Sequence, residues 1–333
     1  MRYDTNDVTI DDLRALAIGI LRQEPDPPVR VRLLRDVLCA PSGDDRLIAA
    51  CDGLSAWAEI AALESEQRDD GSWGRIHSRD TKVRQRYPTT EYAVERATAL
   101  GLSSDHAMLT RAAEYLAGVI TGQRQPLDPP EKNDRWGAGV QLFAAATLAR
   151  INSSHPALDK PWAVWSEVLD AAFANGVYDA QAEAEAQLRL HGATIEDSYL
   201  ILSSRYALTL LSARAGELRQ ERIDPLLTWI GQRADGIGYL GERLDGPPQK
   251  TPGRIERWIQ SWEILSRFPL KPRRARELLD LLDETSDEDG FWDYGERASN
   301  SAVFPLSANW RKRGTRRVDW TTRLLVLESA LVR

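Results

Sequence analysis

A turn that carries an aromatic residue recurs along the chain, and this repetition constrains the fold more than any other feature of the sequence. The copies read DDGSWG at 69–74, NDRWG at 133–137, NGVYD at 175–179, ADGIGY at 234–239 and EDGFWDYG at 288–295. Their aromatic residues lie 42 to 63 residues apart, a spacing that suits one helical hairpin per copy. We therefore expect repeated supersecondary units that stack or close on themselves.

The stretches between these turns have the periodicity of helices. Apolar residues recur at helical spacing, as in 54–67 and 106–120, and no run alternates like a half-buried strand. Each turn follows an amphipathic helix and precedes a more uniformly apolar one, and a helix apolar on most faces is buried from both sides. The buried helices are expected at 90–100, 138–151, 197–213, 257–268 and 320–332. The fold predicted is an all-α α/α toroid, with inner and outer rings built from about five to six helical hairpins.

Residues 1–50 lack the aromatic turn and contain a Pro-Pro turn between two short helices. This segment is expected to form a leading helical hairpin that packs on the ring, with the toroid domain at 51–333. It could instead belong to a sixth unit.

Charge and composition limit the classes of function. The 333 residues carry a net charge of −7, which gives no overall attraction to nucleic acid. No apolar run reaches the roughly 18–20 residues that span a bilayer, and the N-terminus lacks the order of a signal peptide. The two cysteines fit no metal or redox motif, so a cytoplasmic protein is expected, with membrane-surface association possible and the oligomeric state open.

QRDDGSWG at 67–74 resembles the QW repeat of squalene-hopene cyclases and their relatives, with Gln67, Gly71 and Trp73 at the diagnostic positions. QRADGIGY at 232–239 and ETSDEDGFW at 284–292 are degenerate copies. The resemblance implies the terpenoid cyclase and protein prenyltransferase superfamily and its α/α toroid. The repeat itself is expected to be structural, because a glutamine amide can satisfy backbone groups at a helix end.

A second resemblance concerns TIEDS at 194–198, which is similar to the Asp-x-Asp-Asp motif of class II terpene cyclases. It implies that Glu196 and Asp197 are the catalytic acids, with Thr194 and Tyr199 at the substrate. The sequence departs from the motif at its first acid, which is Thr194, and in a glutamate as proton donor. The alternative is ordinary capping, since acids are favoured in the first turn of any helix and threonine at its N-cap.

Aromatic and basic residues gather near the expected starts of inner helices. Indole faces can stabilise a carbocation, although large aromatics also simply fill cores; the candidates are Trp136, Trp258, Trp262, Trp310 and Trp320. Arginines in the same segments could form a cationic mouth for a diphosphate or a carboxylate, or could be ordinary solvated loop charges. The arginines assigned to substrate binding are Arg254, Arg257, Arg316 and Arg317.

These patterns favour a class II-type terpenoid or meroterpenoid cyclase that protonates a prenyl chain carrying an anionic headgroup. The expected partner is a small isoprenoid or prenylated molecule. No metal or cofactor is expected, Mg²⁺ being possible only if the substrate is a diphosphate. The histidines are scattered and no zinc-ligand spacing or DDxxD motif occurs. Two alternatives remain: a noncatalytic lipid- or protein-binding relative, and a carbohydrate-active hydrolase or lyase using acids such as Glu91, Glu196 and Asp319.

Overall fold

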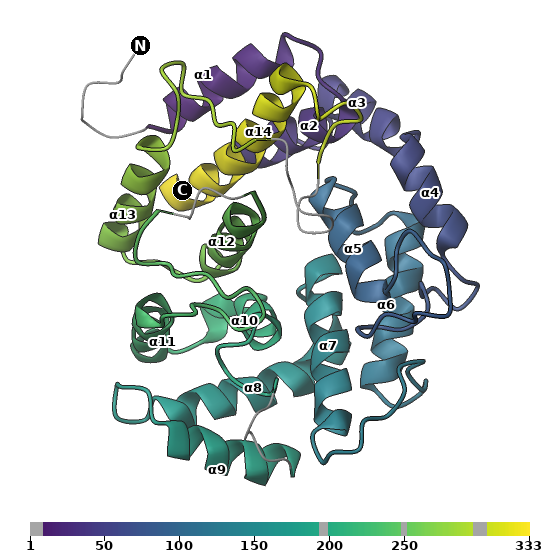
Figure 1. The fold of residues 1–333 in the computed structure, drawn as a ribbon, viewed down its shortest axis with the longest axis vertical. Helices are drawn as coiled ribbons and strands as arrows, with labels where there is room; N and C mark the ends of the chain where they lie inside the picture. The colour runs from purple at the N-terminus through teal and green to yellow at the C-terminus, as the bar shows by residue number, and fades with distance from the viewer. Residues whose placement is uncertain (1–8, 193–198, 248–251, 296–304) are drawn as a thin grey trace.

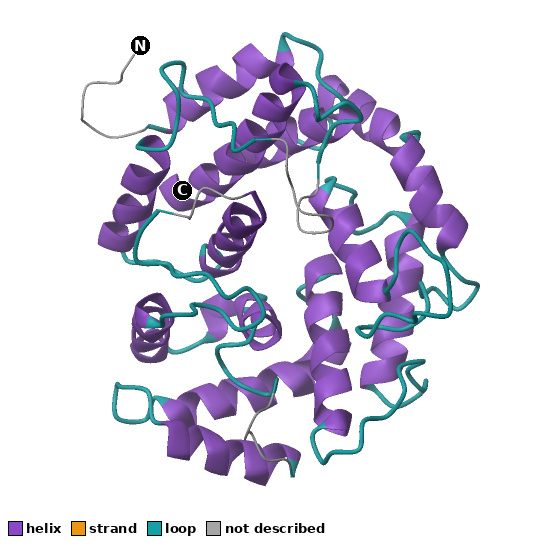
Figure 2. Cartoon of the chain, in the orientation of Figure 1, coloured by secondary structure: helices purple, strands orange, loops and turns teal. Residues whose placement is uncertain are grey.

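The computed structural model describes residues 9–192, 199–247, 252–295 and 305–333. This part of the chain is all-helical and contains no strand (Figure 2). Its α-helices are α1 (Ile10–Leu21), α2 (Pro27–Arg32), α3 (Asp45–Ser55), α4 (Ala58–Glu66), α5 (Thr90–Ala99), α6 (Ala107–Ile120), α7 (Trp136–Ile151), α8 (Asp159–Ala172), α9 (Ala180–His191), α10 (Arg205–Ser212), α11 (Gln220–Gln232), α12 (Pro252–Leu265), α13 (Pro272–Asp283) and α14 (Arg313–Val332). The all-α class predicted from periodicity is confirmed. None of these described helices has both the length and the apolarity to span a bilayer.

Five helices lie toward the middle of the molecule. α5, α7, α10, α12 and α14 contact one another in chain order, and α4, α6, α11 and α13 lie farther from the centre of the view (Figure 1). Inner–outer pairs such as α6 with α7 and α13 with α14 are in contact. For four of the aromatic turns, the next α-helix in the chain is an inner one, as predicted. The third turn, at 175–179, is instead followed by α9, which pairs with α8.

The inner helix expected at 197–213 starts later than predicted. α10 begins at Arg205, and the Ser204 side chain caps it by accepting from the backbone N–H of Ala207. Gly238 holds the chain before the helix, since its N–H donates to the Ser203 carbonyl and its own carbonyl accepts from Arg205. The described segment 199–204 is therefore not helical. Thr194, Glu196 and Asp197 themselves lie outside the described residues.

The N-terminal helices pack on the last helix of the chain. α1 and α2 both contact α14, and Leu13, Ile20 and Val29 form a small apolar cluster with Leu325. The boundary expected at residue 50 falls inside α3, which continues to Ser55.

Two of the aromatic turns make the same hydrogen bonds. In each, the indole N–H donates to a helix carbonyl ten residues earlier and the backbone N–H donates to a threonine hydroxyl on the next inner helix. The pairs are Trp73 with Leu63 and Thr90, at 2.8 and 3.0 Å, and Trp292 with Leu282 and Thr321, at 2.9 and 3.0 Å. Both tryptophans therefore tie an outer helix to an inner one, Trp73 at the first residue of α5 and Trp292 near the middle of α14.

The glutamine of the first QW-like copy connects two outer helices. Gln67 directly follows α4, and its amide nitrogen donates to the carbonyls of Gly71 and Met108, at 2.9 and 2.8 Å. Its amide oxygen accepts from Arg111 on α6. This structural role agrees with the one expected from the sequence.

Candidate acid–base site

The four histidines of the chain differ in what their rings contact. His106 and His155 cap helices, because each Nδ1 accepts a backbone N–H two residues ahead. His191 ends α9, and burial lowers its pKa. His77, by contrast, lies 3.0 Å from a buried carboxylate, which singles it out as a candidate for proton transfer.

The loop that carries His77 is fixed by one buried acid. The Asp128 carboxylate accepts the backbone N–H groups of Ile76, His77 and Ser78, at 2.6, 3.0 and 2.9 Å, and the Ser78 hydroxyl at 3.1 Å. The same loop is bonded to the start of α5, where the N–H of Glu91 donates to the Ile76 carbonyl. The bond between Ile76 and Glu91 therefore holds the His77 loop against the first turn of α5, which carries Glu91.

Three side chains converge at the His77 ring. Its Nδ1 lies 3.0 Å from Glu91 Oε2 and 3.1 Å from the Tyr206 hydroxyl. The Tyr206 hydroxyl also donates a hydrogen bond of 3.2 Å to Glu91 Oε2. The imidazole stacks on Phe143 of α7, with the ring centroids 4.1 Å apart. Helices α5, α7 and α10 therefore each contribute one wall of the site.

The charges around Glu91 keep it ionised. Burial alone would raise its pKa, but the hydrogen bond from His77, the charges of Arg205 and of the His77 ring, and the bond from Tyr206 outweigh burial and lower it. Burial and the nearby Glu91 raise the pKa of Tyr206, so its hydroxyl keeps its proton. Because an ionised carboxylate only accepts, its contact with His77 requires a proton on Nδ1. In the neutral form of the ring, the lone pair is then on Nε2.

Ion pairs continue from this site along the inner helices. Arg205 lies 3.8 Å from Glu91 and 2.5 Å from Glu95, and Arg150 at the end of α7 lies 3.3 Å from Glu95. The two glutamates, one helical turn apart on α5, together raise the pKa of Arg205 although burial opposes them. The site therefore belongs to a buried charged network rather than to an apolar cavity.

Aromatic rings border the histidine. Tyr239 meets the rings of His77 and Tyr206 edge-on, with centroids 6.2 and 5.2 Å away, and Tyr199 packs on Phe143 at 5.3 Å. Tyr239 is exposed and has a φ of +71°, a left-handed conformation that is strained for a tyrosine. Strained residues cluster at functional sites, and this one holds a phenol beside the histidine.

The geometry equips His77 to act as a general base. Its side chain is 30% exposed, and Nε2 makes no hydrogen bond with any residue in the described part of the chain. Proton uptake at Nε2 would create an imidazolium beside an ionised carboxylate, which stabilises it.

The arginines assigned to a cationic mouth have acidic partners within the protein. Arg254 and Arg257 both pair with the buried Glu242, at 3.0 and 2.7 Å. Arg316 pairs with Asp293 at 2.7 Å. Their charges are thus largely committed to the fold.

Arg317 has a similar environment. It binds Asp287 and Asp289, and its guanidinium lies 4.0 Å from the centre of the Phe291 ring. It holds the last aromatic turn against α14.

The tryptophans assigned to the substrate lie in different places. Trp258, Trp262 and Trp320 are buried in the main core, where Trp258 and Trp262 pack edge to face. Trp136, half-buried, is the first residue of α7. Trp310 lines a cavity of about 650 Å³ beside Trp57. None of them contacts the His77 ring through a ring interaction among the described residues.

The acids proposed for a hydrolase are not brought together as a pair. Asp319 accepts from the backbone N–H groups of Leu306 and Ser307 and from the Ser307 hydroxyl, and burial raises its pKa to about 6. Glu91 instead belongs to the histidine site, and Glu196 lies outside the described residues.

Sequence reasoning missed most of the histidine site. Glu91 was considered only as a glycosidase acid, and His77, Asp128 and Tyr206 were not selected. These four residues come from segments up to 129 positions apart, and no local motif marks them.

Neither a scan against protein-family models nor searches of curated proteins and of solved structures finds a match to this chain. Within the described residues, no group of three histidine, cysteine, aspartate or glutamate side chains is placed to hold a metal ion.

Proposed function

We propose that this chain is an α/α toroid enzyme that uses His77 as a general base on a small polar substrate. The observation that carries this proposal is the contact of Nδ1 with an ionised, buried Glu91, which leaves Nε2 available. The toroid is supported by the order of contacts among the inner helices and by a cavity lined jointly by α5, α7, α12 and α14.

In the reaction, Nε2 takes a proton from a substrate C–H or O–H bond, or from water, and the imidazolium is stabilised by Glu91. The proton then passes from Nε2 to the leaving group, which regenerates the neutral histidine. A positioned base of this kind contributes about 10²–10⁴-fold to rate. The exposed Tyr239 hydroxyl is assigned as the second acid. Burial raises its pKa to about 12, so it is protonated at neutral pH.

Elimination or hydrolysis of a carbohydrate-like substrate suits this site better than the two-carboxylate mechanism of most glycosidases. That mechanism needs an acid pair facing a cleft. Glu91 is instead buried and engaged by His77 and Tyr206. The rings of Tyr239 and Tyr199 would supply stacking surfaces for a sugar or another flat, polar group.

A class II cyclase is the second candidate. Tyr199, the residue that follows the acidic segment, packs on Phe143, so the described chain resumes beside the aromatic rings of the site. Protonation of an alkene needs a neutral carboxyl group, and Glu91 is ionised. Under this hypothesis Glu196 or Asp197 must therefore donate the proton, and Tyr199, Tyr206, Tyr239 and Phe143 would stabilise the cation.

Acylation of histidine by diethyl pyrocarbonate tests the base without a known substrate, because the reagent attacks an unprotonated ring nitrogen. At alkaline pH, where the ring is neutral, we expect His77 to react at Nε2 and Glu91→Gln to slow that reaction, as measured by peptide mass spectrometry. Glu64→Gln is the matched control, since Glu64 is 44% exposed and lies 3.8 Å from His106. Equal rates at His77 in the wild type and in Glu91→Gln would contradict the proposal.

A substrate panel then separates the functions. Turnover of uronate-containing oligosaccharides or glycosides that disappears in His77→Gln supports the base. Turnover of prenyl diphosphates that survives His77→Gln and disappears in Glu196→Gln identifies the cyclase. Ligand binding with no turnover across the panel would favour the noncatalytic relative.

A further inference from the structure

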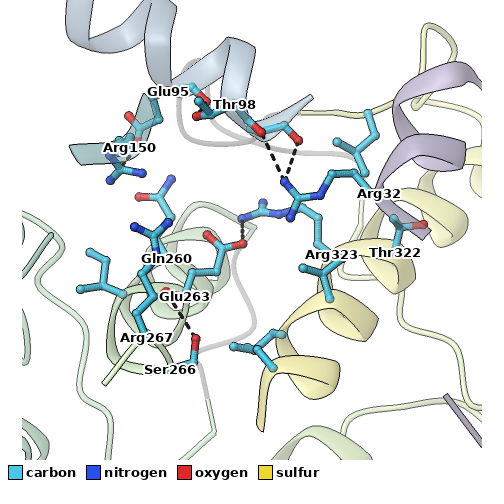
Figure 3. Close-up of a pocket in the computed structure, with 16 residues that line it drawn as sticks. Arg32, Glu95, Thr98, Arg150, Gln260, Glu263, Ser266, Arg267, Thr322 and Arg323 are labelled. Carbon is cyan, nitrogen blue, oxygen red and sulfur yellow. Dashed lines mark hydrogen bonds and ion pairs between the residues drawn. The ribbon is translucent and has the colours of Figure 1, made fainter. Parts of the chain in front are cut away.

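A second charged site lies in a cavity of about 250 Å³ near the C-terminal ends of several inner helices (Figure 3). Its walls come from α5, α7, α12 and α14, with one arginine from α2. The charged side chains that line it are Arg32, Arg150, Arg267, Arg323, Glu95 and Glu263. The lining therefore contains four guanidinium groups and two carboxylates.

Three of the arginines are engaged by the protein. Arg32 pairs with Asp36 at 2.7 Å and donates to the Thr98 carbonyl at the end of α5. Arg150 pairs with Glu95, as described above. Arg323 binds the buried Glu256, and also Glu263 at 3.1 Å.

Arg267 differs from these three. Its guanidinium has no hydrogen bond or ion pair with any described residue, and it extends toward Arg150 and Gln260 (Figure 3). Burial by the surrounding protein lowers the pKa of Arg267 to about 10. The charges of Arg150 and Arg32 lower this pKa further, and the charge of Glu263 opposes them. The side chain is nevertheless accessible to solvent, and it is protonated at pH 7.

An unpaired guanidinium near two others favours anion binding, because an anion between them relieves their mutual repulsion. One structural explanation is that arginines here offset the partial negative charge at helix C-termini. Arg32 does this by binding the carbonyls of Thr98 and Ala99. Arg267 follows the end of α12 but binds no carbonyl among the described residues, so this explanation does not account for it.

We propose that the cavity binds one oxyanion group, a carboxylate or a phosphate, of a small ligand between Arg267 and Arg150. The guanidinium fork matches both groups with two parallel hydrogen bonds. The cavity volume restricts the ligand to a few heavy atoms beyond the anionic group. This site is separate from the His77 base and does not depend on the function proposed for it.

Isothermal titration calorimetry of the full chain with inorganic phosphate and with succinate, at constant ionic strength in chloride, tests the proposal. We expect wild type to bind at least one of these anions and Arg267→Gln to weaken that binding by about tenfold or more, since charge-assisted hydrogen bonds are lost. Arg273→Gln is the matched control, because Arg273 is 90% exposed and pairs with Glu277 on the same helix. The control should bind as wild type does.

The melting temperature without added anion distinguishes a ligand site from a structural role. Loss of repulsion from Arg150 should leave Arg267→Gln as stable as wild type or more stable. A lower melting temperature would show that Arg267 supports the helix ends and would overturn the proposal. Equal anion binding by wild type and Arg267→Gln would overturn it too, as would no binding by wild type at about 10 mM of either anion.

Discussion

Replacing Glu91 with glutamine removes one negative charge from the histidine site while almost preserving the shape of the side chain. The carboxylate accepts hydrogen bonds from His77 Nδ1 and from the Tyr206 hydroxyl at 3.0 and 3.2 Å, and lies 3.8 Å from Arg205. An amide retains one acceptor and turns two N–H donors toward a site that already contains donors. The variant therefore loses charge-assisted bonds and places a donor against a donor.

The expected loss of stability follows from those contacts. A hydrogen bond to a charged group contributes about 1.5–3 kcal/mol, against about 0.5–1.5 kcal/mol for a neutral one. Because two hydrogen bonds and the attraction to Arg205 weaken together, Glu91→Gln should lower the free energy of unfolding by about 2–4 kcal/mol at pH 7. Domains are typically stable by about 5–15 kcal/mol, so the variant should still fold.

Urea denaturation of wild type and variant measures this difference. Glu167→Gln provides the control, since Glu167 and its partner Arg189 are both more than half exposed and their pair should contribute less than about 1 kcal/mol. Equal losses in the two variants would refute the view that Glu91 is the centre of a buried ionic network.

The effect should also depend on pH in a defined direction. The pKa of Glu91 is lowered in the folded state, because its partners outweigh the effect of burial. Its stabilisation is therefore complete above the ordinary carboxyl pKa and is lost as pH falls through the lower, folded-state pKa. The difference between wild type and Glu91→Gln should shrink over that acidic range, and a difference that grows there would contradict this assignment.

Further predictions concern the scaffold. Trp73→Phe and Trp292→Phe should each lower the free energy of unfolding, measured by urea denaturation, by about 1 kcal/mol or more. The two losses should be similar because the indole hydrogen bonds are equivalent, and a large loss in only one variant would contradict that equivalence. Asp128→Asn should speed tryptic cleavage within 75–86, where the loop loses its anchor, and an unchanged rate would contradict that role. Burial and the charge of Asp283 raise the pKa of Glu328 to about 8. Glu328→Gln should therefore become more stable relative to wild type as pH rises from 4.5 to about 8, and thermal melts that show no such gain would contradict the raised pKa.

The sequence predicted the helices better than the site. Periodicity placed the starts of α5 and α7 within two residues, because a helix buried on most faces has a distinct apolar pattern. It placed the starts of α12 and α14 five and seven residues too late. The start of α10, eight residues after the expected one, depends on backbone bonds between Ser203, Arg205 and Gly238. Such long-range pairing leaves no signal in the local pattern.

The charged residues show the same limit. Arg254 and Arg257 lie in the first two turns of α12 rather than in a segment before it. Their role depends on Glu242, and no local pattern indicates that pairing. His77 looked like one of four scattered histidines until the fold brought Glu91 and Tyr206 to its ring. Burial and interaction partners determine the environment of these charged residues, and both are properties of the tertiary structure.

Long-range proton–nitrogen NMR of histidine-labelled protein tests the central claim most directly, because it identifies which ring nitrogen of His77 carries the proton. At alkaline pH, where histidine is neutral, the account predicts a proton on Nδ1 in wild type and a change of that signal in Glu91→Gln. His106, whose Nδ1 accepts a backbone N–H, should show the opposite tautomer in the same spectrum. A proton on Nε2 of His77 in wild type would contradict the proposed base.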